Sequence, residues 1–193
     1  KVPAWRGYVL GAGDGAWRVW LGRSGGLGPD PSDALEHAYG EVALQLLIVS
    51  LCVTPLRNHI GLNLMSHRRT VGVLVFFFAL AHLLVWAVLD VQSLGRIWAD
   101  ILKRPYVTIG MGSFLLLLPL ALTSNDTSVR RLGAKAWRNL HKLTYPAALL
   151  AALHFIWLSK GFQLEPMIYA AVIVGLLMTR FAPRRAPRRA RAT

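Results

Sequence analysis

The stretch TVGVLVFFFALAHLLVWAVL, residues 70–89, has twenty consecutive residues without Asp, Glu, Lys or Arg. About 20 apolar residues in a helix are needed to cross the hydrocarbon core of a bilayer. Within this stretch the ionisable side chain is that of His82. An ionisable residue inside a membrane is costly to keep and therefore points to function. The stretch thus predicts a membrane-spanning helix that carries a functional histidine.

Four more windows without Asp, Glu, Lys or Arg repeat this pattern, at residues 42–56, 105–125, 143–159 and 166–179. In lipid, only helices and closed barrels satisfy the hydrogen bonds of a spanning backbone. The windows are too uniformly apolar for barrel strands, in which apolar and polar residues alternate. The sequence therefore predicts an all-α integral membrane helical bundle over residues 29–180, with five transmembrane helices.

Residues 1–28 are a candidate first helix that hydropathy alone does not identify as a span. Arg6, Asp14 and Arg18 interrupt its apolar residues, and five glycines fall between Gly7 and Gly22.

The charges of the chain indicate its orientation. The net charge is +13, although 54% of the residues are hydrophobic. Basic residues gather in the segments 57–69 and 125–142 and in the tail 181–193. Cytoplasmic loops of membrane proteins are rich in Lys and Arg, so these three segments are predicted to be cytoplasmic, the tail as a disordered basic extension. Since the charge is explained by juxtamembrane loops, no nucleic-acid partner is expected.

Three histidines lie in or at the edge of the predicted spans. His82 lies twelve residues after Thr70, and His154 lies thirteen residues after His141. At 1.5 Å per residue these separations are about 18 and about 20 Å. His82 and His154 should therefore lie at similar depth on two helices, in the outer half of the bilayer. Two imidazoles facing each other across a bundle can bind both axial positions of a heme iron.

His141 lies near the predicted cytoplasmic end of the same helix as His154, where it could bind a second heme. His67 is a candidate partner for it, and Arg68 could contact a heme propionate. Cys52 is the one cysteine, so the chain has no Cys-x-x-Cys-His attachment motif. Any heme is therefore expected to be heme b, held by iron coordination, with one or two hemes per chain.

The chain resembles the MsrQ (YedZ-type) family within the ferric-reductase-like transmembrane group. The resemblance covers residues 27–180, with the three membrane histidines and the loop motifs in the family's order. The matching residues include Leu27-Gly28-Pro29-Asp30-Pro31, Glu36-His37-Ala38, Gly40-Glu41, Val53-Thr54-Pro55-Leu56-Arg57, Arg68-Arg69, Ala81-His82-Leu83-Leu84, Lys103-Arg104-Pro105-Tyr106, Gly110, Leu120-Ala121-Leu122-Thr123-Ser124, Arg130-Arg131-Leu132-Gly133, Leu140-His141-Lys142-Leu143, His154-Phe155 and Pro166.

This resemblance implies six transmembrane helices and His82, His141 and His154 as heme ligands. It implies electron transfer from the quinone pool or a cytoplasmic flavin reductase to a periplasmic molybdopterin-dependent enzyme that reduces protein methionine sulfoxide. A flavin, FMN, is also associated with the family. The implied location is the bacterial inner membrane, with a multi-pass chain and a cytoplasmic C-terminus.

Two other functions are compatible with the residues. One is a stand-alone membrane ferric or quinone reductase, and the other is a small transporter with a histidine proton relay. The sequence shows no nucleotide-binding loop and no catalytic constellation beyond the histidines. It therefore favours an electron-transfer subunit of an oxidoreductase complex over a complete enzyme.

Overall fold

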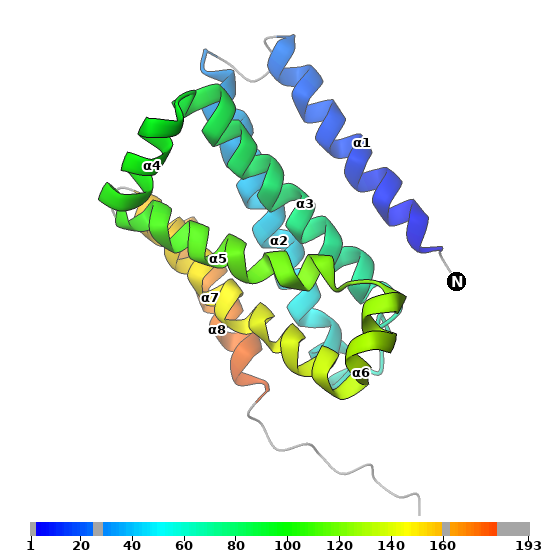
Figure 1. Cartoon of the computed structure of the whole chain (residues 1–193). Coiled ribbons are helices and arrows are strands. Elements are labelled where there is room, and N and C mark those ends of the chain that lie inside the picture. Colours follow the sequence, from blue (N-terminus) through cyan, green and yellow to red (C-terminus); the bar gives the residue numbers. More distant parts are fainter. Residues whose placement is uncertain (1–2, 25–28, 160–162, 181–193) are drawn as a thin grey trace, which may run out of the picture.

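The computed structural model describes residues 3–24, 29–159 and 163–180, which form helices and short connections without a β-strand. The long helices run along a bundle, and α4 and α6 lie at its opposite ends (Figure 1). The elements are α1 (Ala4–Arg23), α2 (Pro31–His59), α3 (Arg68–Leu84), the π-helix η1 (Val85–Val91), α4 (Leu94–Lys103), α5 (Pro105–Leu122), α6 (Asp126–Leu140), the 3₁₀ turn η2 (His141–Leu143), α7 (Thr144–Leu158) and α8 (Leu164–Met178).

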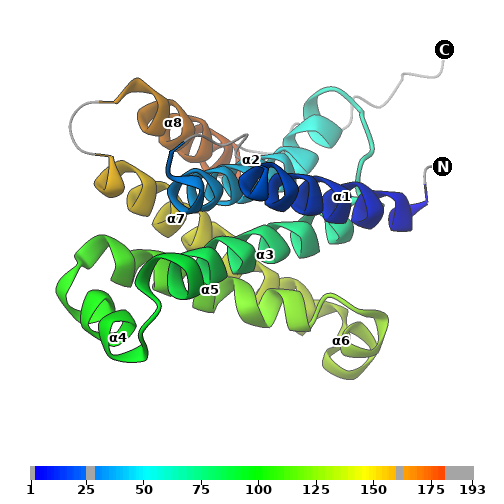
Figure 2. The ribbon, with the colours of Figure 1, turned by 90° about the horizontal axis from the view of Figure 1, so that it is seen from above.

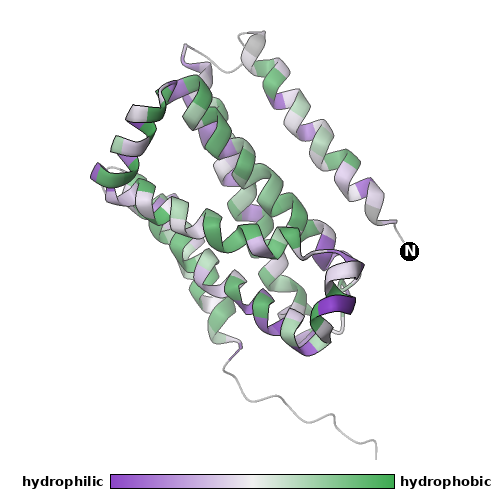
Figure 3. Cartoon of the chain, viewed as in Figure 1, coloured by the Kyte–Doolittle hydropathy of each residue, from purple (hydrophilic) through white to green (hydrophobic). Residues whose placement is uncertain are grey.

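The bundle has the surface of a membrane protein. By length and composition, α2, α5 and the continuous helix Arg68–Val91 are long and apolar enough to cross a bilayer, and α8 is a shorter apolar helix. Large apolar side chains are exposed along these helices, for example Leu115 and Val174. Figure 3 shows apolar residues along the long helices and polar residues concentrated near α6. Because an exposed apolar surface this extensive is suited to lipid, the predicted all-α membrane bundle is confirmed.

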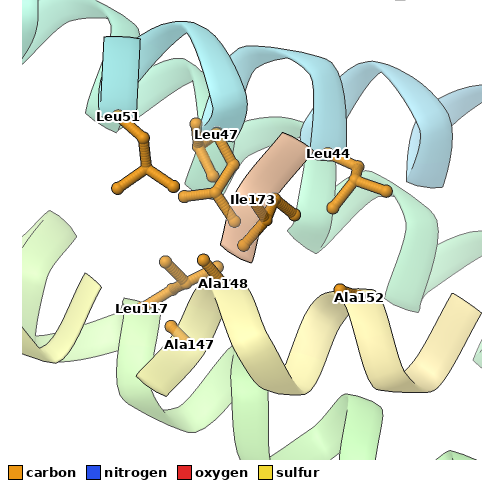
Figure 4. Packing of buried hydrophobic residues seen from close by; sticks show 9 residues of the cluster. Leu44, Leu47, Leu51, Leu117, Ala147, Ala148, Ala152 and Ile173 are labelled. Atoms are coloured by element: carbon orange, nitrogen blue, oxygen red, sulfur yellow. The ribbon is translucent and has the colours of Figure 1, made fainter. Parts of the chain in front are cut away.

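At the centre of the bundle, leucines of α2 pack against alanines of α7. Leu44, Leu47 and Leu51 of α2 point toward an alanine face of α7, and Ile173 of α8 closes the cluster (Figure 4). The alanines are Ala147, Ala148 and Ala152. Small residues let transmembrane helices approach closely. This packing fixes α7 against α2 just before His154.

The candidate first helix of residues 1–28 is helical from Ala4 to Arg23, and it lies along α2 and α3 (Figure 2). Three of its glycines, spaced by four residues, form the face in contact with α3. Gly7, Gly11 and Gly15 lie against Thr70, Leu74 and Phe77 respectively. This is the small-xxx-small pattern of membrane helix pairs, which hydropathy does not detect.

Polar groups of α1 form an ion pair within the helix and a hydrogen bond with α2. Arg18 Nε donates to Asp14 Oδ2 at 2.7 Å, one helical turn away. The hydroxyl of buried Tyr39 donates to the Gly15 carbonyl at 2.8 Å, which ties α1 to α2. Two of the three charges that interrupt the apolar residues of this segment, Asp14 and Arg18, are therefore paired with each other in the folded chain.

The segment 125–142, expected as a cytoplasmic loop, contains a helix. Asn125 caps α6 by accepting from the Ser128 amide at 2.8 Å. Arg69, beside the start of α3, donates to Asp126 at 2.5 Å and holds the pKa of that exposed carboxyl below its usual value. Polar composition suggested a loop, whereas the cap and this ion pair keep a helix at the end of the bundle.

Candidate functional site

His82 of α3 and His154 of α7 face each other inside the bundle. Their ring centroids are 6.2 Å apart, and their ring planes are inclined by 77°. A metal ion bound linearly between two imidazoles, about 2.0 Å from each nitrogen, would separate the ring centroids by roughly 6 Å. The observed spacing therefore fits two axial ligands of one iron. In the described ranges no group of three or more His, Cys, Asp or Glu could hold a metal ion, so the pair does not belong to a larger protein-only metal site.

Backbone carbonyls orient both rings. The Nδ1–H of His82 donates to the Glu36 carbonyl at 2.8 Å, and the Nδ1–H of His154 donates to the Tyr106 carbonyl at 2.7 Å. A carbonyl oxygen only accepts, so each Nδ1 carries the proton. In the neutral imidazole Nε2 then keeps its lone pair, which is the state that ligates a metal.

A cavity surrounds the histidine pair. The cavity is partly open to the surroundings. Its wall is mainly apolar, as in cofactor sites. Besides the two histidines the lining includes Leu44, Leu47, Val75, Ala79, Trp86, Val107, Met111, Phe114, Leu117, Ala151 and Phe155, and the polar residues Glu36, His37, Glu41 and Ser113. Opposed neutral imidazoles within an apolar cavity fit a six-coordinate heme.

The local structure around His82 departs from a regular α-helix. The π-helix η1 begins three residues after His82 and carries Trp86 to the cavity wall. Single π-helical turns occur frequently at functional sites.

The site lies at the end of the bundle that carries α4. Glu36 is in the second turn of α2, Tyr106 is in the first turn of α5, and His154 lies four residues before the end of α7. This end is opposite the basic residues around α6.

His141 lies apart from the pair, at the α6 end. It belongs to η2, so it is not part of the regular helix that carries His154. Its ring stacks on Trp137 with centroids 3.8 Å apart, and its Nδ1–H donates to the Trp137 carbonyl at 3.0 Å. Its Nε2 lies 3.5 Å from the Ser124 hydroxyl. The Nδ1 proton of His141 is thus held by a carbonyl, as in the other two histidines. Unlike His82 and His154, which face each other, His141 has a tryptophan ring stacked against it.

The remaining candidates lie near the surface. His67 precedes α3 and has its Nδ1 3.1 Å from the hydroxyl of Ser66. Arg68 is the first residue of α3 and is partly buried. Of the other histidines, His37 is an exposed residue of α2 that lines the cavity, and His59 is exposed at the end of α2.

Comparisons with known proteins identify the family of the chain. Residues 39–152 match the family of ferric reductase like transmembrane components, a range that includes His82 and His141. This defines the class: a helical membrane component of the ferric reductase type.

Curated relatives define the family more closely. The heme-binding subunits MsrQ of protein-methionine-sulfoxide reductase from Brucella ovis, Brucella melitensis biotype 2 and Brucella suis biovar 1 are each 45% identical over 179 residues. Each match covers 92% of this chain and 81% of the relative. The chain belongs to the MsrQ family of these subunits. No solved structure matches it.

The hydrogen-bond acceptors that orient the imidazoles of His82 and His154 could not be predicted from the sequence. These are the backbone carbonyls of Glu36 and Tyr106, and every residue has a carbonyl. No residue type marks them, so only the folded backbone identifies them.

Proposed function

We propose that this chain is a membrane electron-transfer subunit that carries electrons through heme b bound by His82 and His154. The observation that carries the proposal is the opposed pair of imidazoles 6.2 Å apart, each with its Nδ1 proton held by a carbonyl. Heme iron, when bound, supplies reversible one-electron oxidation and reduction. The curated relatives are heme-binding subunits, which supports heme over other cofactors.

The residues of the chain supply binding, orientation and exclusion of water. His82 and His154 present Nε2 lone pairs from opposite sides of the cavity. Apolar side chains such as Leu47, Val75 and Phe114 provide walls for a macrocycle. Since both ligands come from helices packed in one core, the site needs little rearrangement between oxidation states.

The position of the site suits delivery to the outer side of the membrane. We assign the α6 end to the cytoplasm, because Arg69, Arg130 and Arg131 gather there, and we assign the C-terminus to the same side. The histidine pair then lies toward the periplasm of a bacterial inner membrane. A periplasmic molybdopterin-dependent enzyme that reduces protein methionine sulfoxide is the proposed electron acceptor.

His141 is proposed as the ligand of a second heme nearer the cytoplasmic side. His67 is the candidate second ligand and Arg68 the candidate propionate contact, both near the same end of the bundle. The proposed donors are the quinone pool or a cytoplasmic flavin reductase, and FMN is a further candidate cofactor. The proposed unit comprises residues 29–180 together with the packed first helix, followed by a basic cytoplasmic tail.

The first experiment is a pyridine hemochrome assay and a reduced-minus-oxidised spectrum of the detergent-purified protein. The expected result is a b-type spectrum in which the contribution of the His82–His154 heme is lost in His82→Ala and in His154→Ala and kept in His59→Ala, the exposed control. A second heme would appear as a heme-to-protein ratio of about two that falls to about one in His141→Ala. Protein without heme after expression with heme supplied would refute the proposal and favour the transporter function.

A further inference from the structure

Two glycines lie directly against the histidine pair, one under each ring. A Cβ atom on Gly110 of α5 would lie 2.8 Å from Nδ1 of His154 and 3.0 Å from its Cε1. A Cβ atom on Gly40 of α2 would lie 3.1 Å from Nδ1 of His82 and 3.3 Å from its Cε1. Both separations are shorter than ordinary van der Waals contacts, so each ring occupies space that any other residue would fill with its own side chain.

Each glycine follows, by four residues, the residue whose carbonyl accepts the hydrogen bond from the neighbouring imidazole. Glu36 is four residues before Gly40, and Tyr106 is four residues before Gly110. In an α-helix the carbonyl of residue i accepts the N–H of residue i+4. The imidazole therefore donates to the carbonyl that also receives the glycine N–H. The ring can approach that carbonyl because the glycine one turn later has no side chain.

We infer that Gly40 and Gly110 are positioning residues that seat the two imidazoles on their carbonyls and so set the ligand strength of Nε2. This inference rests on the proposed heme function. Neither glycine has a side chain that could bind a metal. Each would act on the proposed heme through the position of its histidine ring.

The hydrogen bond at Nδ1 has an electronic consequence. Donation from Nδ1–H to a carbonyl fixes the tautomer and raises the basicity of the other nitrogen. A more basic Nε2 stabilises oxidised iron more than reduced iron. Displacing the ring from its carbonyl should therefore raise the reduction potential and weaken heme binding. Loss of such an outer hydrogen bond typically costs about 10- to 100-fold in metal affinity.

The test compares four alanine variants in the full chain. Gly110→Ala and Gly40→Ala perturb the rings, while Gly72→Ala in α3 and Gly175→Ala in α8 are matched controls with nothing within 4 Å of the added carbon. Helix content by circular dichroism and yield of folded protein are recorded for each variant. Heme affinity is measured by titration of the heme-depleted protein, and the reduction potential is measured by potentiometric titration.

The expected order is set by the two distances. Gly110→Ala should raise the potential and lower heme affinity most, Gly40→Ala should do so less, and the two controls should match the wild type. Electron paramagnetic resonance of the oxidised protein should show changed low-spin signals in the first two variants only. A purely structural role would lower yield without moving the potential of the heme that remains.

The outcomes separate the inference from the function on which it rests. Wild-type protein without heme would refute the proposed function. Wild-type protein with heme, together with a Gly110→Ala potential equal to that of Gly72→Ala, would overturn the inference alone. If Gly110→Ala does not fold, the milder Gly40→Ala decides the question by the same measurements, and failure of both to fold would overturn a positioning role.

Discussion

Replacement of Gly11 by alanine tests whether α1 is docked on α3 through its glycines. The matched control is Gly13→Ala, in the same helix and with the same change in composition. A Cβ atom on Gly11 would overlap the side chain of Leu74, whereas one on Gly13 has nothing within 4 Å. The two variants therefore differ in packing and share their effect on helix propensity.

The expected magnitudes follow from these contacts. Alanine in place of glycine favours a helix by about 1 kcal/mol, so Gly13→Ala should be neutral or stabilising by up to that amount. At Gly11 the same gain is opposed by overpacking, which costs about 1–3 kcal/mol. The free energy of unfolding of Gly11→Ala should then lie below that of Gly13→Ala by about 1–3 kcal/mol.

The assay is reversible unfolding in mixed detergent micelles containing increasing sodium dodecyl sulfate. Tryptophan fluorescence is a suitable probe of unfolding, because Trp86 is buried in the folded bundle. Equal or greater stability of Gly11→Ala relative to Gly13→Ala would refute the glycine-mediated docking.

Three further predictions address the site and its surroundings. Ala151→Phe should fill the cavity and lower the heme-to-protein ratio without touching a ligand, while Ala134→Phe on the exposed face of α6 should leave the ratio unchanged. His141→Ala should retain the spectrum of the His82–His154 heme, and loss of all heme in this variant would contradict the separation of the two regions. Because Arg69 lowers the pKa of Asp126, their ion pair should stabilise α6 above the usual carboxyl pKa and be lost as the pH falls below it. Hydrogen exchange of α6 amides should show this acid sensitivity in the wild type and a weaker one in Asp126→Asn.

The apolar windows predicted the membrane bundle because charge-free runs of this length have few other structures available. A similar depth in the membrane for His82 and His154 could also be predicted, because the rise of an α-helix is fixed at 1.5 Å per residue. The rise could not give the facing of the rings, which depends on how α3 and α7 pack. That packing follows from the contact of α3 with α2 and of α7 with α5.

The sequence was least informative where polar residues lie in helices. The first helix was uncertain because Asp14 and Arg18 lower its hydropathy, and only the fold shows that they pair with each other. The α6 helix was expected as a loop because its basic residues dominate its composition. His141 was placed on the helix of His154, but the 3₁₀ turn at η2 separates it from α7.

The acceptors at the histidine pair belong to the main chain, and this makes the site tolerant of mutation in an unusual way. Substitution of Glu36 or Tyr106 removes a side chain and leaves the carbonyl that holds each imidazole. In many metal sites the corresponding acceptor is a carboxylate, which a single substitution deletes. The hydrogen bond that orients each imidazole is therefore kept when residue 36 or 106 is substituted, because its acceptor belongs to the backbone.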